Sequence, residues 1–399
     1  MQGGSLPLGC AAMRFEAPDY LNLDELLTEE QKMVRESVRR FVDAEVLPII
    51  ADHYSEGTFP KHLIKMIGEL GLLGSNLKGY GCAGVDATTY GLIMQELERG
   101  DSGIRSFTSV QGSLAMYAIH AYGSEAQKEK WLPRMATGDA IGCFGLTEPD
   151  YGSNPSGMLT TAEKRGSSYI LNGTKMWITN GCLSELAVIW AKVDGKIRGF
   201  IVETDRPGFT STTIHRKFSL RASVTSELNM SNVEIPEDNL LPKVAGLKGP
   251  LGCLTSARYG VAWGTIGAAM ACYSEALSYA KQRVQFSRPI AGYQLVQQKL
   301  VKMLNDITTS QLMMMRVAQL KESGGATAWH VSMGKRHCVS MALDAARVTR
   351  DILGANGIMD EYQCFRHMCN LESVSTYEGT HDIHTLIMGQ KITGLAAFE

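Results

Sequence analysis

Ser168-Tyr169-Ile170-Leu171-Asn172-Gly173-Thr174-Lys175-Met176-Trp177-Ile178-Thr179 carries a β pattern between two regions whose patterns are helical. Apolar, aromatic and β-branched residues flank Asn172-Gly173, a dipeptide typical of tight two-residue turns, so the stretch predicts a hairpin. Asp194-Gly195 lies in a similar setting and predicts a second hairpin. Residues 226–235 alternate between apolar and polar side chains and predict a further strand. We therefore assign residues 140–250 to a compact antiparallel β domain.

Helical patterns stand on both sides of this domain. Before it, two helices begin at capping boxes, Thr28-Glu29-Glu30-Gln31 and Ser124-Glu125-Ala126-Gln127, whose first and fourth residues can bond each other reciprocally. After it we predict three long helices, over Ser256–Phe286, Tyr293–Glu322 and Ala326–Leu353. Helices of about 30 residues are roughly 45 Å long, and three or four of them side by side form a bundle.

The predicted fold class is therefore α+β and mostly α. An N-terminal helical domain covers residues 14–139, the middle antiparallel β domain covers 140–250, and a C-terminal helical bundle covers 251–399. Residues 1–13 are short of basic residues before their apolar run, so they make a poor signal peptide. We expect them to be a disordered lead or a remnant of expression.

Composition limits the classes of function. The chain has 399 residues, of which 44% are hydrophobic and 20% charged, which suits a large globular core. The formal net charge of -2 gives no reason to expect nucleic acid or an anionic membrane as partner. No stretch reaches the roughly 20 apolar residues that span a bilayer, so no integral membrane segment is expected. The nine cysteines include no CxxC pair, which favours reduced thiols in a bacterial cytoplasm or mitochondrial matrix.

Thr376-Tyr377-Glu378-Gly379-Thr380 contains the candidate catalytic group. A single carboxylate can act as a general base if it is held in a cleft with little water. Gly379 allows close approach of a ligand to the backbone, because it has no Cβ. The alternative is a solvated glutamate in an ordinary loop.

Two stretches near the β domain suit a flat ligand. Residues 144–153 are rich in turns and supply backbone N–H groups, hydroxyls and two glycines, which can bond a polar heterocycle or a phosphate. Trp177 and Thr179 lie on one face of a predicted strand, where an indole can stack on a ring and a hydroxyl can bond it. The alternatives are a plain linker for the first stretch and core packing for Trp177.

The other candidates have simple structural alternatives. Arg283 suits a phosphate, but a basic residue in the last turn of a helix also interacts well with the helix dipole. Residues 353–357, Leu-Gly-Ala-Asn-Gly, form a helix C-cap and match neither a Walker loop nor a Gly-x-Gly-x-x-Gly fingerprint. Arg105 can be an ordinary surface arginine. His381 and His384 lack a third ligand with fitting spacing, so no metal site is predicted.

In this order, five motifs together resemble the acyl-CoA dehydrogenase family over residues 20–398. They are Gly145-Leu146-Thr147-Glu148-Pro149, Trp177-Ile178-Thr179, Arg283 with Gln285-Phe286, Leu353-Gly354-Ala355-Asn356-Gly357 and Tyr377-Glu378-Gly379-Thr380. The resemblance implies the three-domain fold with a C-terminal four-helix bundle, FAD as cofactor and a homotetramer. Residues 96–106, 217–223 and 377–384 resemble most closely the members that act on glutaryl-CoA.

The resemblance also implies roles for individual residues. Glu378 would abstract the α-proton of the thioester while N5 of the flavin takes the β-hydride. The residues implied to bind FAD are Phe144, Leu146, Thr147, Gly152, Ser153, Trp177, Ile178, Thr179, Arg283, Phe286, Gln294, Asp351, Leu353, Gly354, Ala355, Thr380 and Phe398. The residues implied to bind the substrate are Glu98, Arg105, Ser106, Ser153, Leu251, Arg258, Tyr377 and Gly379.

The resemblance implies that Arg105 determines the substrate specificity. Glutaryl-CoA carries a carboxylate at the far end of its acyl chain, and a buried charge needs a partner, which Arg105 beside Ser106 can supply as a bidentate pair. The implied reaction is FAD-dependent α,β-dehydrogenation of glutaryl-CoA with decarboxylation to crotonyl-CoA and CO2, in lysine and tryptophan degradation. Electron-transferring flavoprotein is the implied electron acceptor. A non-decarboxylating or short-chain acyl-CoA dehydrogenase or oxidase, or a non-catalytic scaffold protein, are the alternatives.

Overall fold

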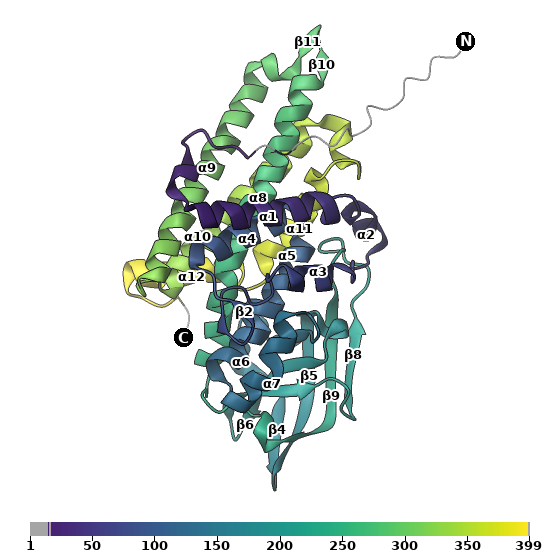
Figure 1. Ribbon diagram of the computed structural model, residues 1–399, viewed down its shortest axis with the longest axis vertical. Coiled ribbons are helices and arrows are strands. Elements are labelled where there is room, and N and C mark those ends of the chain that lie inside the picture. The colour runs from purple at the N-terminus through teal and green to yellow at the C-terminus, as the bar shows by residue number, and fades with distance from the viewer. Residues whose placement is uncertain (1–14, 16, 398–399) are drawn as a thin grey trace, which may run out of the picture.

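The computed structural model describes residue 15 and residues 17–397, so the predicted lead at 1–13 lies outside the described part. Helices precede and follow a β domain, as predicted, and the molecule is elongated (Figure 1). The strands β4, β5 and β9 stand at one end, and the small hairpin of β10 and β11 stands at the other. The three-domain α+β fold class is confirmed.

The N-terminal domain is helical throughout its core. Its main helices are α1 (Glu29–Phe41), α2 (Ile50–Glu56), α3 (Leu63–Glu69), α4 (Ala87–Gly100), α5 (Ser102–Ser109), α6 (Tyr117–Tyr122) and α7 (Glu125–Ala136). A short strand pair, β1 (Lys78–Gly79) with β2 (Cys82–Ala83), precedes α4. Both predicted capping boxes are present: Thr28 Oγ1 accepts from the N–H of Gln31, and Ser124 Oγ from that of Gln127, each at 3.2 Å.

The middle domain is a seven-stranded sheet. Its strands are β3 (Gly142–Gly145), β4 (Thr161–Arg165), β5 (Ser168–Thr179), β6 (Leu186–Val193), β7 (Lys196–Glu203), β8 (Phe209–Thr213) and β9 (Thr225–Pro236). The order is β3-β6-β4-β5-β9-β8, with β7 paired to β6. Most pairs are antiparallel, as predicted, but β3 and β4 both run parallel to β6, so the sheet is mixed. The predicted Asp194-Gly195 hairpin joins β6 to β7, with φ 47° and 76° at the turn.

The hairpin predicted at Asn172-Gly173 is wrong. β5 continues through this dipeptide as one strand, with only a register shift against β9. Backbone pairing explains this, because β5 is paired with β9 on both sides of the dipeptide and with β4 as far as Asn172. Asn172 Oδ1 also accepts from the N–H of Asn232 on β9 at 2.8 Å. The turn lies instead at Gly166, with φ 60°, between β4 and β5.

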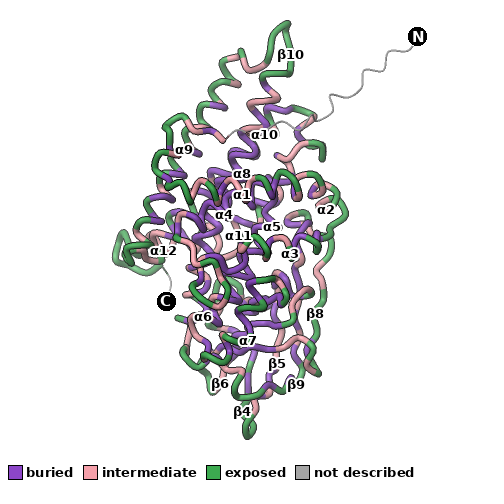
Figure 2. Tube along the Cα trace, viewed as in Figure 1, coloured by how far each residue is buried: buried purple, intermediate pink, exposed green. Residues whose placement is uncertain are grey.

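The C-terminal bundle contains the longest helices. They are α8 (Lys248–Gln282), α9 (Gln294–Glu322), α10 (Ala328–Ile352), α11 (Cys364–Thr376) and α12 (His381–Thr393). Figure 2 shows that the crossing of α8 with α4 and α10 is buried, whereas β10 is exposed. At Gly267 the backbones of α8 and α4 meet so closely that a Cβ would lie 1.8 Å from the carbonyl oxygen of Gln95.

One helix end differs from the prediction. The sequence pattern predicts a helix that continues to Phe286, but α8 ends at Gln282. β10 (Val284–Gln285) and β11 (Arg288–Pro289) form a hairpin there, with positive φ at Phe286 and Ser287. Arg283 is therefore the C-cap residue and does not lie in the last helical turn.

Candidate active site

Glu378 lies in the short link between α11 and α12, with its backbone in the left-handed region at φ 56°. Non-glycine residues seldom adopt this conformation, because Cβ crowds the following carbonyl group. Arg258 Nε, on α8, donates to the carbonyl of Glu378 at 2.5 Å. Lys335 Nζ, on α10, donates to the carbonyls of Tyr377 and Gly379, the latter at 2.6 Å. Two cations therefore bond three consecutive carbonyl oxygens of the predicted catalytic link.

The carboxylate of Glu378 lacks a hydrogen-bond partner at one of its oxygens. The residue as a whole is half-buried, but its Oε2 is fully buried and has no hydrogen-bond partner in the described part of the chain. Burial raises the pKa of Glu378, while the cations Arg258, Lys335 and Arg105 oppose that rise. A carboxylate in this setting is suited to accept a proton from a bound ligand. The alternative of a solvated loop glutamate is therefore wrong.

Arg105 reaches the same link from the N-terminal domain. It lies on α5 and is 2% exposed, so the alternative of a surface arginine is wrong. Its Nε donates to Glu98 Oε2 at 2.7 Å, and its Nη2 donates to the hydroxyl of Tyr377. Ser102 Oγ donates to the other oxygen of Glu98 at 2.8 Å. Within the described residues Nη1 of Arg105 has no hydrogen-bond partner, which leaves one edge of the guanidinium for a further acceptor.

The Glu98–Arg105 pair depends on a glycine of α8. A Cβ at Gly264 would lie 2.1 Å from Glu98 Oε2 and 3.2 Å from Arg105 Nε. No other residue type fits there without moving the ion pair. Ser106, predicted to assist Arg105, is also buried. The structure thus brings Glu98, Arg105 and Tyr377 together beside Glu378.

Trp177 stands where the flat ligand was predicted. It is 60% exposed and has φ 63°, so the alternative of core packing is wrong. A register shift between Lys175 and Ile178 turns the indole outward and leaves Ile178 in the buried position. The N–H of Met176 donates to the carbonyl of Thr147 at 2.9 Å, which places the two predicted stretches side by side. An exposed indole next to half-buried hydroxyls suits stacking and bonding of a planar ring.

The remaining residues of the first stretch differ in exposure. Phe144 and Leu146 are buried in the core, and the ring of Phe144 lies 6.1 Å from that of Trp190. These two residues can therefore offer a ligand only their main-chain atoms. Gly152 and Ser153 are exposed.

A buried ion pair holds this stretch in place. Lys175 Nζ donates to Glu148 Oε1 at 2.8 Å and to the carbonyl of Leu146 at 3.1 Å. Glu148 also accepts from the N–H groups of Leu159 and Thr160, at 2.6 and 3.0 Å. Burial lowers the pKa of Lys175 to about 8, against the effect of Glu148. The pair thus ties the turn after β3 to β5.

Replacing Lys175 with methionine is expected to lower the free energy of unfolding by about 3 kcal/mol, because it leaves the carboxylate of Glu148 buried and unpaired. The midpoint of urea unfolding measures this change. Lys164→Met is the matched control, because Lys164 pairs with Glu237 on the surface and such pairs contribute about 1 kcal/mol or less. Equal midpoints for the two variants would contradict the prediction.

A second set of predicted cofactor residues lies elsewhere in this chain. Arg283, Phe286 and Gln294 are exposed at or beside the β10–β11 hairpin, at the end of the molecule opposite to β5 (Figure 1). Asp351, Gly354 and Ala355 are exposed at the end of α10, whereas Leu353 is buried. Thr380 caps α12, and its Oγ1 accepts from the N–H of Ile383 at 3.1 Å. Phe398 lies outside the described residues. One chain therefore keeps the β10–β11 hairpin apart from β5, which carries Trp177 (Figure 1).

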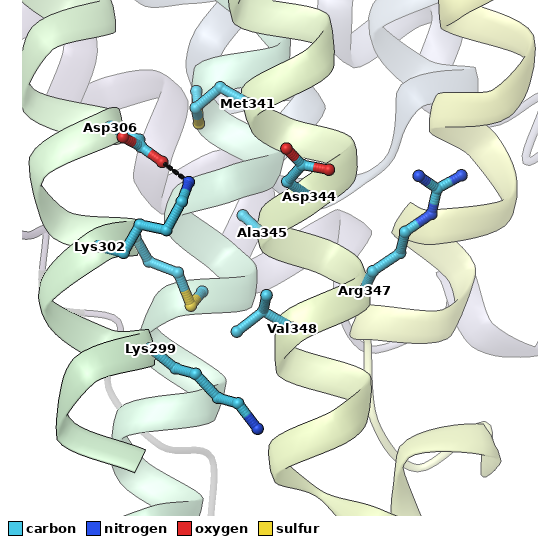
Figure 3. Close-up of a pocket in the computed structure, with 9 residues that line it drawn as sticks. Lys299, Lys302, Asp306, Met341, Asp344, Ala345, Arg347 and Val348 are labelled. Atoms are coloured by element: carbon cyan, nitrogen blue, oxygen red, sulfur yellow. Dashed lines mark hydrogen bonds and ion pairs between the residues drawn. The ribbon is translucent and has the colours of Figure 1, made fainter. Parts of the chain in front are cut away.

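Two hollows adjoin the bundle. One, of about 190 Å³, lies between α9 and α10, and its floor is apolar at Met341, Ala345 and Val348 (Figure 3). Lys302 pairs with Asp306 across its wall, and none of the predicted site residues lines it. The other hollow, of about 240 Å³, is lined by Gly252, Thr255 and Ser256 of α8 together with Lys321 and the start of α10. The α8 residues that line it lie between Leu251 and Arg258, the two residues of this helix that the resemblance implies for substrate binding.

Comparison with known families assigns most of the chain. Residues 28–139 match the N-terminal domain of acyl-CoA dehydrogenase, residues 143–233 match its middle domain, and residues 245–393 match its C-terminal domain. The chain belongs to the acyl-CoA dehydrogenase family. Acyl-CoA dehydrogenase activity follows from this membership together with the site described above.

Individual relatives agree with this assignment. Glutaryl-CoA dehydrogenase from Mycobacterium smegmatis is 52% identical, with a TM-score of 0.95, and the match covers 97% of this chain and all of that one. A second structure of a glutaryl-CoA dehydrogenase from that organism, in complex with FADH2, is 50% identical, with a TM-score of 0.94, over 95% and 98% of the two chains.

Curated relatives are more distant. An acyl-CoA dehydrogenase of Bacillus subtilis is 36% identical over 92% of this chain and 99% of its own length. A short-chain specific acyl-CoA dehydrogenase of Clostridium acetobutylicum is 32% identical over 93% of this chain and all of its own length. The relatives thus include an enzyme whose name specifies short-chain substrates.

Lys335 and Lys175 are not among the residues predicted from the sequence, although each interrupts a recognisable apolar pattern. Lys335 falls on the buried face of α10, four residues after Val331 and three before Cys338. Lys175 falls on the buried face of β5, in period with Tyr169 and Leu171. A lysine at a core position is rare unless it is paired, so both positions could have been identified from periodicity.

The described residues contain neither a candidate membrane-spanning helix nor a candidate metal site. In that part of the chain, no helix has the length and apolar character needed to cross a bilayer. Nor do His, Cys, Asp and Glu side chains gather there in groups of three that could hold a metal. His384 is buried, and its Nδ1 lies 3.0 Å from Ser332 Oγ.

Proposed function

We propose that this protein catalyses the FAD-dependent α,β-dehydrogenation of glutaryl-CoA and its decarboxylation to crotonyl-CoA and CO2. The observation that carries the proposal is the buried guanidinium of Arg105, paired with Glu98 and adjacent to Tyr377 and Glu378. A cation at this depth is costly unless a ligand or a partner needs it. Glu98 balances this charge, and a carboxylate at the far end of an acyl chain would accept from the N–H groups of the guanidinium that Glu98 and Tyr377 leave free.

The residues near Trp177 suit the isoalloxazine ring of FAD. The exposed indole offers a stacking face, and Thr147 and Thr179 offer hydroxyls on the same rim. Arg283, Gln294 and the end of α10 would hold the adenine and diphosphate part in a second copy of the chain, since one chain keeps the two sets apart (Figure 1). A homotetramer, as the family resemblance implies, would provide such copies.

Glu378 would begin the reaction as a general base. Its carboxylate takes the proton from the α-carbon of the thioester, and the raised pKa caused by burial improves this transfer. When bound, FAD supplies the acceptor for the hydride that leaves the β-carbon. Electrons would pass on to electron-transferring flavoprotein. Burial of the site excludes water that would otherwise solvate the carboxylate.

Decarboxylation would depend on Glu378 and Arg105. The bond between the terminal carboxylate and the adjacent carbon breaks, and its electron pair delocalises through the new double bond onto the thioester carbonyl as a dienolate. Glu378, now protonated, returns its proton to the terminal carbon and gives crotonyl-CoA. Arg105 must orient the carboxylate without holding it so tightly that loss of CO2 is opposed.

A short-chain acyl-CoA dehydrogenase without decarboxylation is the second candidate. The similarity to the short-chain specific relative favours it, because that similarity extends over 93% of this chain. The two candidates differ in what Arg105 does. Only a substrate with a terminal carboxylate uses the free edge of the guanidinium.

Product analysis tests the proposal directly. The purified protein is mixed without oxygen with glutaryl-CoA and an artificial electron acceptor, and the products are measured by mass spectrometry. Crotonyl-CoA with an equal amount of CO2 is the expected result. Glutaconyl-CoA alone would leave the oxidation and remove the decarboxylation. Turnover of butyryl-CoA without any turnover of glutaryl-CoA would support the second candidate.

A further inference from the structure

Lys335 is a buried charge that no step of the reaction uses. It lies on α10 and is 1% exposed. Its Nζ donates to the carbonyls of Tyr377 and Gly379, which flank the catalytic residue on either side. Glu378 between them has φ 56°, and Gly379 has φ 89°. Gly379 adopts this region freely, but a glutamate does so at a cost in free energy, so contacts from outside the link help to hold Glu378 in this conformation.

We propose that Lys335 is a positioning residue, which holds the link between α11 and α12 so that the carboxylate of Glu378 faces the substrate. The inference rests on the proposed role of Glu378 as the base. It adds the means by which the base keeps its unusual backbone conformation.

Three features of the geometry support this role. The two carbonyls that Lys335 bonds belong to the residues before and after Glu378, so a single side chain fixes both ends of the turn. Space around Gly379 is closed, because a Cβ there would lie 2.9 Å from Arg258 Nη2 and 3.1 Å from His384 Nε2. Both bonds survive deprotonation of Lys335, since a neutral amine keeps two N–H groups. Lys335 can therefore hold the carbonyls of Tyr377 and Gly379 whether or not it is charged.

In its protonated form, Lys335 also affects the pKa of Glu378. Burial lowers the pKa of Lys335 to about 7, opposed by Glu378 and reinforced by Arg258 and Arg105. While protonated, Lys335 favours the carboxylate form of Glu378. Other titratable groups that face these two residues come from α4, α5, α8, α12 and the link itself. They are Tyr90, Arg105, Cys253, Arg258, Tyr377, His381 and His384.

The test measures proton transfer without the redox step. The probe is 3-thiabutyryl-CoA, which has α-protons but a sulfur atom in place of the β-carbon, so it cannot lose a β-hydride. The holoenzyme is incubated with the probe in D2O, and deuterium at the α-carbon is measured by mass spectrometry as a function of pD. The variants are Lys335→Met, Lys335→Arg and Glu378→Gln. Lys302→Met, an exposed lysine on α9, is the matched control.

Lys335→Met is expected to lower the exchange rate per folded, FAD-loaded site by about 100-fold, the order of loss caused by small misplacements of a reacting group. The acid limb of the pD profile is expected to move to higher pD, because the pKa of Glu378 rises when the cation is removed. Lys335→Arg, which keeps the charge and the N–H donors, is expected to recover part of the rate. Lys302→Met should match the unaltered protein.

Failure of the inference and failure of the proposed function give different results. If Lys335→Met exchanges at the unaltered rate with an unmoved profile while Glu378→Gln does not exchange, the inference is overturned and the base stands. If Glu378→Gln exchanges like the unaltered protein, the proposed role of the base is overturned. Should Lys335→Met not fold, Lys335→Gln is measured with the same two outcomes.

Discussion

Replacing Glu378 with glutamine is expected to lower kcat by about 10⁴-fold, the upper range for removal of a general base. Glutamine has nearly the same shape but cannot accept the α-proton. The carbonyl of residue 378 would still accept from Arg258, so the link should keep its conformation. Acyl-CoA binding and FAD content should therefore change little. Stopped-flow mixing with substrate, followed by the loss of flavin absorbance, measures the effect.

The pH dependence of this step has a defined sign. Burial raises the pKa of Glu378, so the basic form is lost at a higher pH than for an exposed glutamate. The rate of flavin reduction should rise with pH through that pKa and then level off. In Glu378→Gln, the residual rate of flavin reduction should no longer fall as the pH is lowered. Reduction at the unaltered rate in this variant would remove Glu378 from the mechanism.

Replacing Arg105 is expected to reduce kcat/KM for glutaryl-CoA by about 100-fold or more, since the loss of one partner of a buried charge pair costs about 2–5 kcal/mol. With butyryl-CoA, which has no terminal carboxylate, the same change should have a small effect. The ratio of the two kcat/KM values is the measured quantity. A similar loss on both substrates would contradict the assigned role of Arg105.

The choice of variant matters because Arg105 also neutralises Glu98. Arg105→Ala alone leaves the carboxylate of Glu98 buried without its cation, and such a change destabilises the fold by about 3–5 kcal/mol. The double variant Glu98→Gln with Arg105→Met removes both charges at similar volume. It should stay folded and retain butyryl-CoA turnover. Its loss of preference for glutaryl-CoA isolates recognition of the carboxylate from stability.

Sequence patterns determined most of the fold, because they depend on local chemistry. Both capping boxes and the Asp194-Gly195 turn are present as predicted. The three-domain order followed from a change in the spacing of apolar residues. The motif around Glu378 was also recognisable, since five short motifs in one order are far more specific than any one of them.

Long-range contacts decided those parts of the fold and of the site that local sequence patterns do not predict. Asn172-Gly173 has the composition of a turn, but pairing of β5 with β4 and β9 keeps it within one strand. Taken alone, Arg105 has the pattern of a surface residue; the family resemblance implies that it binds the substrate, and the structure places it against Tyr377, 272 residues away. The donors that bond the carbonyls around Glu378 come from α8 and α10, and local sequence does not record which carbonyl a distant side chain will reach. The sequence determined which residue types are available for chemistry. Only the packing of α4, α5, α8 and α10 around the link decided which of them act together, because partners are selected by distance in space.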